Sequence, residues 1–429
     1  MQFMDVSKYI ECPTCGKFMI KVKTKNGETV KRIYFNNSAT PLVLKNVMDN
    51  LNCEIPWLTY INAPGIISEK NTLKYENVRS TILKLIDGDE EKDSVIYVKN
   101  ATEGINFLAK FFKDENPDKF VITTAMEHMA NYLPFKVNFP TKVVGITEKG
   151  ELDLCQLENI LKNYAGNVSL VTVTGASNVT GITTPIYEIA RIAHKYGAKI
   201  LVDIVQVIQH KPFSMMPHEC DEHIDFVVFS AHKCYSPLNG GALVGPKKFF
   251  EKFNPVLYGS GSTKFVNDNK ILYADIPQRF EAGYPEYFGT LAMGKALNAL
   301  NKIGLNRISK YERELFLYVK EEMSKIPNII IYGDKSNNVI IPNISFNISN
   351  MYYKDVAKYL VDNFGIETGA GVVGADIYVQ KLLGISPKEA YVRFMRENPV
   401  GLVRISLGMY NTFDEVDSFI HAIKTLAFK

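Results

Sequence analysis

A lysine, Lys233, stands directly behind a run of residues that is typical of a buried strand. Residues 225–229 are apolar after the first position and rich in residue types that favour strands. Such a strand carries Lys233 to the carboxyl end of an open α/β sheet, where ligands bind in these folds. A lysine in a partly desolvated site has a lowered pKa and becomes a nucleophile for carbonyl groups. Ser230 and His232, just before it, can donate hydrogen bonds to an anion such as a phosphate.

Further polar side chains stand where predicted strands or helices begin or end. Thr102 opens a predicted helix and can bind an anion at its positive end, while His128 and Asn178 follow predicted strands. Asp203, with Gln206 three residues on, closes a very apolar strand, where a carboxylate is costly unless it meets a cation or a donor. Taken singly, each of these residues fits an ordinary capping, turn or loop role. The prediction that they form a functional site depends on all of them occurring together.

The elements that position these residues alternate between about residues 70 and 250. We predict strands at 95–98, 120–123, 143–146, 168–173, 200–205 and 226–229, and helices at 103–112, 154–164 and 186–196. This alternation indicates a largely parallel sheet covered on both faces. A second series predicts helices at 311–325, 354–364 and 414–426, with strands at 329–332, 339–348 and 403–407. We therefore predict an α/β protein with a second, smaller α+β domain and a site in the cleft between the two.

Composition bounds the class of protein. The chain has 429 residues, 46% hydrophobic and 22% charged, with a net charge of +3, so it offers no argument for binding nucleic acid or a membrane. No apolar run is long enough to span a membrane, and the amino-terminal residues lack the apolar core of a signal peptide. Six cysteines in a chain this long do not make a disulfide framework, so we expect a cytoplasmic protein.

We divide the chain into three parts. Residues 1–33 form an extension that contains the Cys12-x-x-Cys15 turn, residues 34–304 a large domain, and residues 305–429 a small one. The earliest residues of the large domain are also able to pack with the small one. Cys12 and Cys15 could bind zinc or cycle as a dithiol, but no second close Cys/His pair follows, so we favour a surface extension.

The polar residues, in this order, resemble the class V aminotransferases, which are fold type I pyridoxal-phosphate enzymes, and above all their cysteine desulfurase and selenocysteine lyase branch. The resemblance runs from about residue 33 to the carboxyl terminus. The motifs that carry it span residues 34–40, 100–106, 127–131, 177–181, 202–206, 230–233 and 403–412.

The resemblance assigns a role to each residue. Lys233 forms the Schiff base with pyridoxal 5'-phosphate and moves the proton at the substrate Cα, Asp203 pairs with the pyridinium nitrogen, and His128 stacks on the ring; these three are the expected catalytic residues. The remaining expected contacts are Gln206 with the phenolic oxygen, Thr102, Ser230 and His232 with the phosphate, Arg404 with the substrate carboxylate, and Asn178 with both cofactor and substrate. No metal is expected. Enzymes of this fold build their site across a dimer interface, so the resemblance implies a homodimer.

Four positions depart from the family pattern. Gly374 stands where desulfurases carry the loop cysteine that takes the substrate sulfur as a persulfide, and Gly369 where an arginine helps to bind the substrate. Ala101 replaces a threonine of many relatives, and Tyr284 replaces a threonine that reaches the partner subunit's phosphate. Residues 381–399 are extra chain between the loop and the Arg404 strand. A glycine offers no nucleophile, so the usual route to a persulfide is closed.

We therefore predict an enzyme that acts on an amino acid through its cofactor-bound form and Cα deprotonation. A C–S lyase that works by β-elimination without a persulfide cysteine comes first, because β-elimination needs no loop cysteine and the branch acts on cysteine-like substrates. An aminotransferase or epimerase is the alternative. A non-catalytic, desulfurase-like protein that binds a partner is a third interpretation, and a desulfurase that uses a different cysteine is a fourth. The sequence does not name the substrate.

Overall fold

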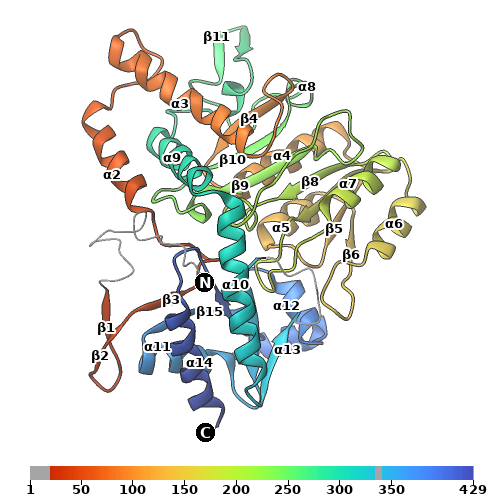
Figure 1. Ribbon diagram of the computed structural model, residues 1–429. Helices are drawn as coiled ribbons and strands as arrows, with labels where there is room; N and C mark the ends of the chain where they lie inside the picture. The colour runs from red at the N-terminus through yellow and green to blue at the C-terminus, as the bar shows by residue number, and fades with distance from the viewer. Residues whose placement is uncertain (1–19, 334–340, 429) are drawn as a thin grey trace.

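Strands that are almost continuous apolar runs form the larger sheet of the computed structural model, which describes residues 20–333 and 341–428 (Figure 1). Its seven strands lie in the order β4-β10-β9-β8-β7-β5-β6. All run parallel except β10, which is antiparallel to both neighbours. The bounds are β4 (Asp93–Val98), β5 (Phe120–Thr124), β6 (Thr141–Val144), β7 (Val168–Thr174), β8 (Lys199–Asp203), β9 (Phe226–Ser230) and β10 (Gly241–Pro246). The predicted α/β fold with a mostly parallel sheet is confirmed.

Helices cover both faces of this sheet, which explains why its strands carry apolar residues at successive positions. Along β4, Val95 and Tyr97 belong to one buried cluster, while Ile96 and Val98 belong to the other. The second cluster lies beneath α4 (Ala101–Glu115), α5 (Met129–Asn138) and α8 (Lys247–Phe250). The first lies beneath α3 (Ile66–Leu85), α6 (Leu154–Asn163), α7 (Ile186–Lys195) and α9 (Tyr287–Ile303).

The smaller sheet has five strands in the order β13-β14-β16-β15-β3. They are β3 (Ile33–Phe35), β13 (Ile329–Tyr332), β14 (Asn343–Ile348), β15 (Ile366–Gly371) and β16 (Leu402–Ser406). β3 runs parallel to β15, and the other pairs are antiparallel. The helices beside this sheet are α10 (Leu305–Ser324), α11 (Tyr353–Phe364) and α14 (Phe413–Ala427). A strand from near the start of the chain thus completes the carboxyl-terminal sheet and links the two ends of the sequence (Figure 1).

Shorter elements decorate the periphery. They are the hairpins β1 (Lys21–Lys23)–β2 (Thr29–Lys31) and β11 (Thr263–Asn267)–β12 (Lys270–Tyr273), the helices α2 (Lys45–Glu54), α12 (Asp376–Leu382) and α13 (Pro387–Met395), and the 3-10 turns η1 (Ile55–Trp57), η2 (Ala231–Lys233) and η3 (Gln278–Phe280). The extra segment at 381–399 forms α13, which exposes Tyr391, Phe394 and Met395. Cys12 and Cys15 lie outside the described residues. Within the described ranges, no helix combines the length and apolarity needed to cross a bilayer.

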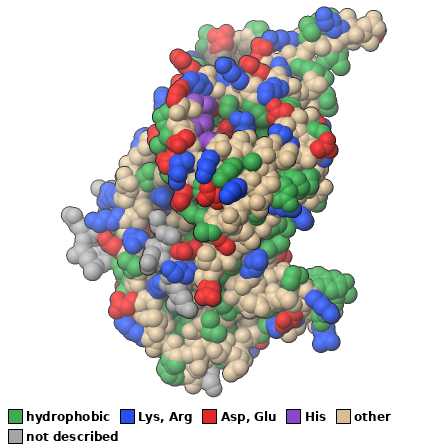
Figure 2. Space-filling view, turned by 90° about the vertical axis from the view of Figure 1, so that its right-hand side faces the viewer, with side chains coloured by type: hydrophobic (Ala, Val, Ile, Leu, Met, Phe, Trp, Pro, Cys, Tyr) green, Lys and Arg blue, Asp and Glu red, His purple; other side chains and the backbone are tan. Residues whose placement is uncertain are grey.

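Charged side chains of both signs are interspersed over the face shown in Figure 2. No large field of one sign dominates that face, in keeping with the small net charge of +3. An extended surface of one sign is the usual footprint of a nucleic-acid-binding protein. This face therefore offers no such footprint.

Candidate active site

A cavity of about 470 Å³ opens at the carboxyl ends of the parallel strands, between the larger sheet and strands β15 and β16 of the smaller one. This is where ligands bind in open α/β sheets. All nine residues predicted for the site line this cavity: Thr102, His128, Asn178, Asp203, Gln206, Ser230, His232, Lys233 and Arg404. The structure thus brings together side chains that are up to about three hundred residues apart in the chain.

Lys233 ends η2, the short turn that directly follows β9. Its Nζ donates hydrogen bonds to the backbone oxygens of Ser38 at 2.5 Å and Ala39 at 2.6 Å. Burial, and next the positive charge of Arg404, lowers the pKa of Lys233 to about 7, against the opposing effect of Asp203. A substantial fraction of the amine is therefore neutral, and so nucleophilic, near neutral pH.

Asp203 is the last residue of β8 and is buried. One carboxylate oxygen accepts a hydrogen bond from the Val205 amide at 2.9 Å. Burial raises the pKa of Asp203 to about 6, against the opposing effects of that amide and of Lys233. Gln206 donates from Nε2 to the Ser38 oxygen at 3.0 Å, while its buried Oε1 has no partner within the described chain. Both side chains have unused capacity toward the cavity, the carboxylate for a cation and the amide oxygen for a donor.

The amino end of α4 forms the corner nearest Ser230. Asn100 caps the helix by accepting a hydrogen bond from the Glu103 amide. The Ala101 amide donates to Ser230 Oγ at 2.8 Å, so the hydroxyl hydrogen of Ser230 remains available for a ligand. Thr102 faces the same cavity from the first turn of the helix. An anion fits this corner, because a helix amino terminus carries partial positive charge and unpaired N–H groups.

Two neutral imidazoles complete this side of the cavity. Burial, and next the charge of Lys233, lowers the pKa of His232 to about 4. Burial also lowers the pKa of His128 to about 4, with further effects from Lys233 and Arg404. His128 is the cap of α5, and its Nδ1 accepts a hydrogen bond from the Ala130 amide at 3.1 Å. That bond requires the lone pair on Nδ1, so the ring proton resides on Nε2.

Buried hydrogen bonds fix the residue before His128. Both Thr124 and Asn131 donate to the Glu127 carboxylate at 2.6 Å, and the Thr174 amide donates to it at 3.0 Å. Burial raises the pKa of Glu127 to about 8. His128 thus follows a carboxyl group that is fully engaged with protein donors.

Arg404 projects from β16 and is buried. Its Nη1 donates to the Asn178 oxygen at 2.9 Å and its Nη2 to Asn36 Oδ1 at 2.7 Å, while Nε has no partner within the described residues. No carboxylate of residues 20–333 or 341–428 forms an ion pair with it, and burial lowers its pKa to about 10. The guanidinium therefore offers a full positive charge to a carboxylate ligand.

Asn36 is a site residue that the sequence analysis missed as an individual. It lies 368 positions before Arg404 and reaches it because β3 and β16 flank the same strand, β15. Nothing in the local sequence distinguishes this asparagine from its neighbour Asn37, which faces away into buried contacts. Its membership of the motif at 34–40 was the one available signal.

The loop after β15 borders the cavity at Val373, and its backbone oxygens hold it in place. The Met129 amide donates to the Gly374 oxygen at 2.7 Å, and Asn178 Nδ2 donates to the Val373 oxygen at 2.8 Å. None of the four cysteines in the described part of the chain lines the cavity. The nearest in sequence to Lys233, Cys234, is buried with its Sγ 3.7 Å from the Ser230 oxygen, and burial raises its pKa far above the ordinary value.

Two other departures from the family pattern also have a place in the structure. Ala101 lines the cavity at the start of α4, where its amide binds Ser230. Tyr284 lies outside the cavity, exposed, with its ring 5.4 Å from that of Tyr60. It makes no contribution to the site within this chain.

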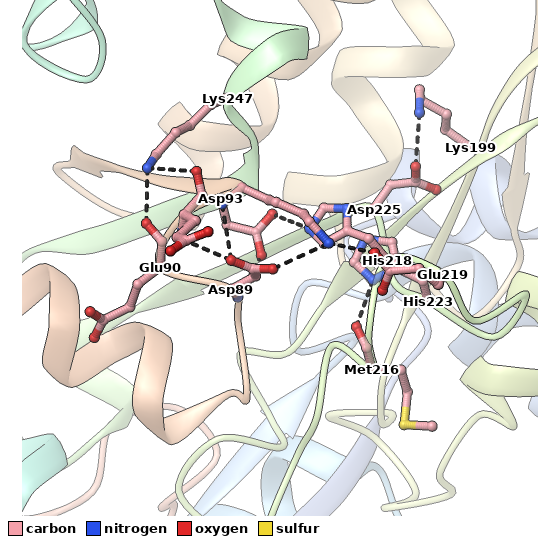
Figure 3. Close-up of polar contacts among 12 residues, drawn as sticks. Asp89, Glu90, Asp93, Lys199, Met216, His218, Glu219, His223, Asp225 and Lys247 are labelled. Carbon is pink, nitrogen blue, oxygen red and sulfur yellow. Dashed lines mark hydrogen bonds and ion pairs between the residues drawn. The ribbon is translucent and has the colours of Figure 1, made fainter.

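A second polar cluster lies at the opposite, amino ends of the strands (Figure 3). His218 pairs with Asp93 at 3.0 Å, and its ring lies 4.1 Å from that of His223. Asp225 pairs with Lys199 at 2.8 Å. These contacts fasten the β8–β9 connection beneath the sheet, far from the cavity. Across the described ranges, no group of three or more His, Cys, Asp or Glu side chains has an arrangement that could hold a metal ion.

Comparisons with known proteins agree with this geometry. A family model for the class V aminotransferases matches residues 33–419. The chain is 32% identical over 367 residues to a cysteine desulfurase of Wigglesworthia glossinidia brevipalpis, with 83% of each chain covered. It is 30% identical over 368 residues to one of Escherichia coli (strain K12 / DH10B), with 84% of each covered. The apo structure of a cysteine desulfurase from Thermococcus onnurineus NA1 matches with a TM-score of 0.85 at 26% identity, covering 100% of this chain and 99% of that one.

Proposed function

Because the chain belongs to the class V aminotransferases, a family of enzymes that depend on pyridoxal phosphate, we propose that it is a desulfurase-like C–S lyase. In this proposal it cleaves the Cβ–S bond of a cysteine-like amino acid by β-elimination, without a persulfide cysteine. The observation that supports the proposal is the lining of the cavity: it contains the residues expected to bind cofactor and carboxylate, and none of the cysteines in the described part of the chain.

The residues present fit pyridoxal phosphate. The phosphate suits the amino end of α4, where the Ser230 hydroxyl and Thr102 face the cavity. The pyridinium nitrogen suits Asp203, whose pKa burial raises to about 6 and which a cation would stabilise in its charged form. The phenolic oxygen suits the amide of Gln206, although its donor now binds the Ser38 oxygen. Lys233, with its pKa lowered to about 7, suits the aldehyde carbon.

When bound, pyridoxal phosphate supplies an electron sink for negative charge that develops at the substrate Cα. The chain supplies the rest. Arg404 binds the substrate carboxylate and so fixes the orientation of Cα. Lys233 then accepts the Cα proton at Nζ, for which its lowered pKa suits it near neutral pH. The neutral ring of His128 can pack flat against an aromatic ligand without burying a charge.

The products follow from the missing nucleophile. In a desulfurase a loop cysteine attacks the substrate sulfur, which leaves alanine and a persulfide. Without that thiol, loss of the Cα proton would be followed by cleavage of the Cβ–S bond, and the sulfur would leave with the electron pair of that bond as sulfide. The enamine that remains hydrolyses in water to pyruvate and ammonia. The balanced reaction for L-cysteine consumes one water and yields pyruvate, ammonia and hydrogen sulfide.

The charges in the cavity favour this reaction over transamination with a dicarboxylic partner. Asp203, Lys233 and Arg404 are the charged residues among the described residues that line it. Bound cofactor would engage the first two, which would leave Arg404 for one carboxylate. A second carboxylate would be desolvated with no cation to meet it, and that is expensive. The substrate class we propose is therefore a neutral amino acid with one carboxylate.

We also propose that the active protein is a homodimer. Apolar side chains are exposed on η1 and the chain after it, where Trp57 and Tyr60 lie, and on the β11–β12 hairpin, where Phe265 and Val266 lie. Tyr284 packs against Tyr60 in the first of these groups. Large exposed apolar groups of this kind mark interaction sites in soluble proteins.

The test is sulfide release from L-cysteine by the holoenzyme and by variants in which each of the six cysteines is replaced in turn by serine. We expect every variant, including Cys12→Ser and Cys15→Ser, to keep wild-type sulfide release, and Lys233→Ala to lose it. Loss of sulfide release in one cysteine variant would instead identify a desulfurase with an unusual nucleophile. Conversion of cofactor to its amine form with release of a keto acid would establish an aminotransferase, and exchange of the Cα hydrogen with inversion an epimerase.

A further inference from the structure

We propose that Gly374 is a positioning residue for His128, and that the loop around it is now a fixed wall of the cavity rather than a carrier of a nucleophile. A Cβ atom added at Gly374 would lie 2.3 Å from His128 Nε2, 2.7 Å from Cδ2 and 3.2 Å from Cε1. The backbone φ of Gly374 is +77°, which side chains rarely adopt. The inference rests on the proposed function only in giving His128 a role at the cofactor.

Moving the His128 ring to make room for a Cβ atom at position 374 would break hydrogen bonds. Its Nδ1 accepts the Ala130 amide as the cap of α5, a bond that rotation of the ring would break. Its backbone is fixed on one side by Glu127, which three buried donors hold. On the other side the Met129 amide is bound to the Gly374 oxygen itself. A side chain at position 374 would therefore cost the helix cap or the contact that docks the loop.

Moving the loop at residues 373–375 away from His128 would also break contacts. The Val373 oxygen accepts a hydrogen bond from Asn178, the residue whose own oxygen binds Arg404. Val373 has a φ of +45°, an unusual value for a branched side chain, so two successive residues have left-handed backbone. Ala375, which follows, is buried at the start of α12. The turn is thus held from three directions.

Because of these contacts, position 374 requires a glycine. The glycine is needed for packing and is not explained by the absence of a thiol alone. A cysteine placed there would press its Cβ into the imidazole and displace the ring before its sulfur could approach a substrate. The chain is therefore expected not to regain desulfurase chemistry by the single change Gly374→Cys. The Asn178 bond also joins this turn to the carboxylate-binding arginine, so displacement of the loop should disturb substrate binding as well.

The test compares Gly374→Ala and Gly374→Cys with Gly371→Ala in the holoenzyme. Gly371 is the matched control: its φ is +107°, and an added Cβ would find its nearest neighbour at 3.9 Å, so this variant carries the backbone strain without the collision. The readouts are the imidazole NMR signals of selectively labelled histidine, assigned with His128→Ala, the visible circular dichroism of the cofactor, and turnover.

We expect Gly374→Ala to shift the His128 signal, raise the pKa of its ring toward the ordinary value, change the cofactor signal and lower turnover more than tenfold. Gly371→Ala should leave the His128 signal unchanged. In a His128→Ala background, Gly374→Ala should lower turnover less than twofold further, because the glycine acts through the histidine. Gly374→Cys should behave like Gly374→Ala and carry no persulfide.

An unchanged His128 signal in Gly374→Ala, additive losses in the double variant, or a persulfide on Gly374→Cys with alanine as product would overturn the proposal. If the variants do not fold, the wild-type protein decides. Its His128 ring should carry its proton on Nε2, because Nδ1 accepts the Ala130 amide beside Gly374, and a proton on Nδ1 would contradict the packing described. The NMR and cofactor signals do not depend on C–S lyase activity, so failure of the proposed function would be seen separately.

Discussion

Arg404 is buried, positively charged and without a carboxylate partner among the described residues. Burying such a charge is costly, and the cost is tolerated when a ligand completes the pair. Asn36 orients the guanidinium through an uncharged amide oxygen and does not neutralise its charge. A carboxylate at position 36 would occupy the same hydrogen bond and also neutralise the arginine.

Replacing Asn36 therefore tests whether that charge is reserved for substrate. We expect Asn36→Asp to raise the KM for the amino acid by more than tenfold, because the new carboxylate competes with that of the substrate, while kcat changes less. Asn36→Ala removes one hydrogen bond and should raise KM only severalfold. Steady-state kinetics of the three proteins decide the matter; an aspartate variant no worse than the alanine variant would contradict the argument.

The lowered pKa of Lys233 predicts a pH dependence for loading the cofactor. Only the neutral amine attacks an aldehyde, and a pKa of about 7 means that the neutral fraction rises through pH 7 and levels off near pH 8. The rate at which the apoprotein regains its visible absorbance on addition of pyridoxal phosphate should follow that curve. A rate that keeps rising in proportion to hydroxide up to pH 10 would indicate an ordinary lysine.

At this scale the sequence predicted many of the polar residues that line the cavity. Lys233, Asp203 and Ser230 were visible because each terminates or directly follows a strongly apolar strand, and the ends of parallel strands meet at one edge. Asn36 was not, because its partner Arg404 is 368 positions away, on a strand that the fold brings beside the residues after β3. The lack of space for a Cβ atom at Gly374 beside the His128 ring could not be predicted either, since it depends on a backbone turn that no residue pattern encodes.

Among the elements, α4 has the clearest functional task. Its amino end, with its partial positive charge, faces the cavity, and the Ala101 amide holds Ser230 there. We expect Ser230→Ala to weaken pyridoxal phosphate binding about tenfold, because a hydroxyl donor to a charged group is lost. Ser236→Ala, another buried serine whose hydroxyl binds the Leu238 oxygen outside the cavity, should leave affinity unchanged. Equilibrium titration of the apoproteins measures both, and equal affinities in the two variants would exclude Ser230 from the anion site.

The elements themselves were largely predictable where apolar periodicity was strong. β13 was predicted with its observed bounds, whereas predicted strand 200–205 ends at Asp203, where the side chain accepts the Val205 amide and turns the chain. β10 was missed because two glycines, Gly241 and Gly245, lie within it. Those glycines are required: a Cβ at Gly241 would lie 2.6 Å from the Phe229 oxygen, and one at Gly245 would lie 2.4 Å from the Phe226 ring.

At the scale of the whole molecule, the proposed homodimer can be tested at the exposed apolar residues of the β11–β12 hairpin. Phe265 and Leu133 are almost equally exposed, at 48% and 49%, but Leu133 lies on α5, outside the hairpin. We expect Phe265→Asp to shift the protein toward monomer at micromolar concentration, because a buried unpaired charge is costly, and Leu133→Asp to leave the dimer intact. Sedimentation velocity distinguishes the two. A wild-type protein that sediments as a monomer would contradict the dimer.

The central claim is that this chain keeps the cofactor chemistry of its family while it has lost the nucleophile that accepts sulfur. The most direct test is the ratio of pyruvate to alanine formed from L-cysteine by the holoenzyme, measured by mass spectrometry against the sulfide released. The account predicts one pyruvate for each sulfide and no alanine. Alanine in step with sulfur transferred to the protein would contradict it, because that product requires a thiol at the substrate sulfur.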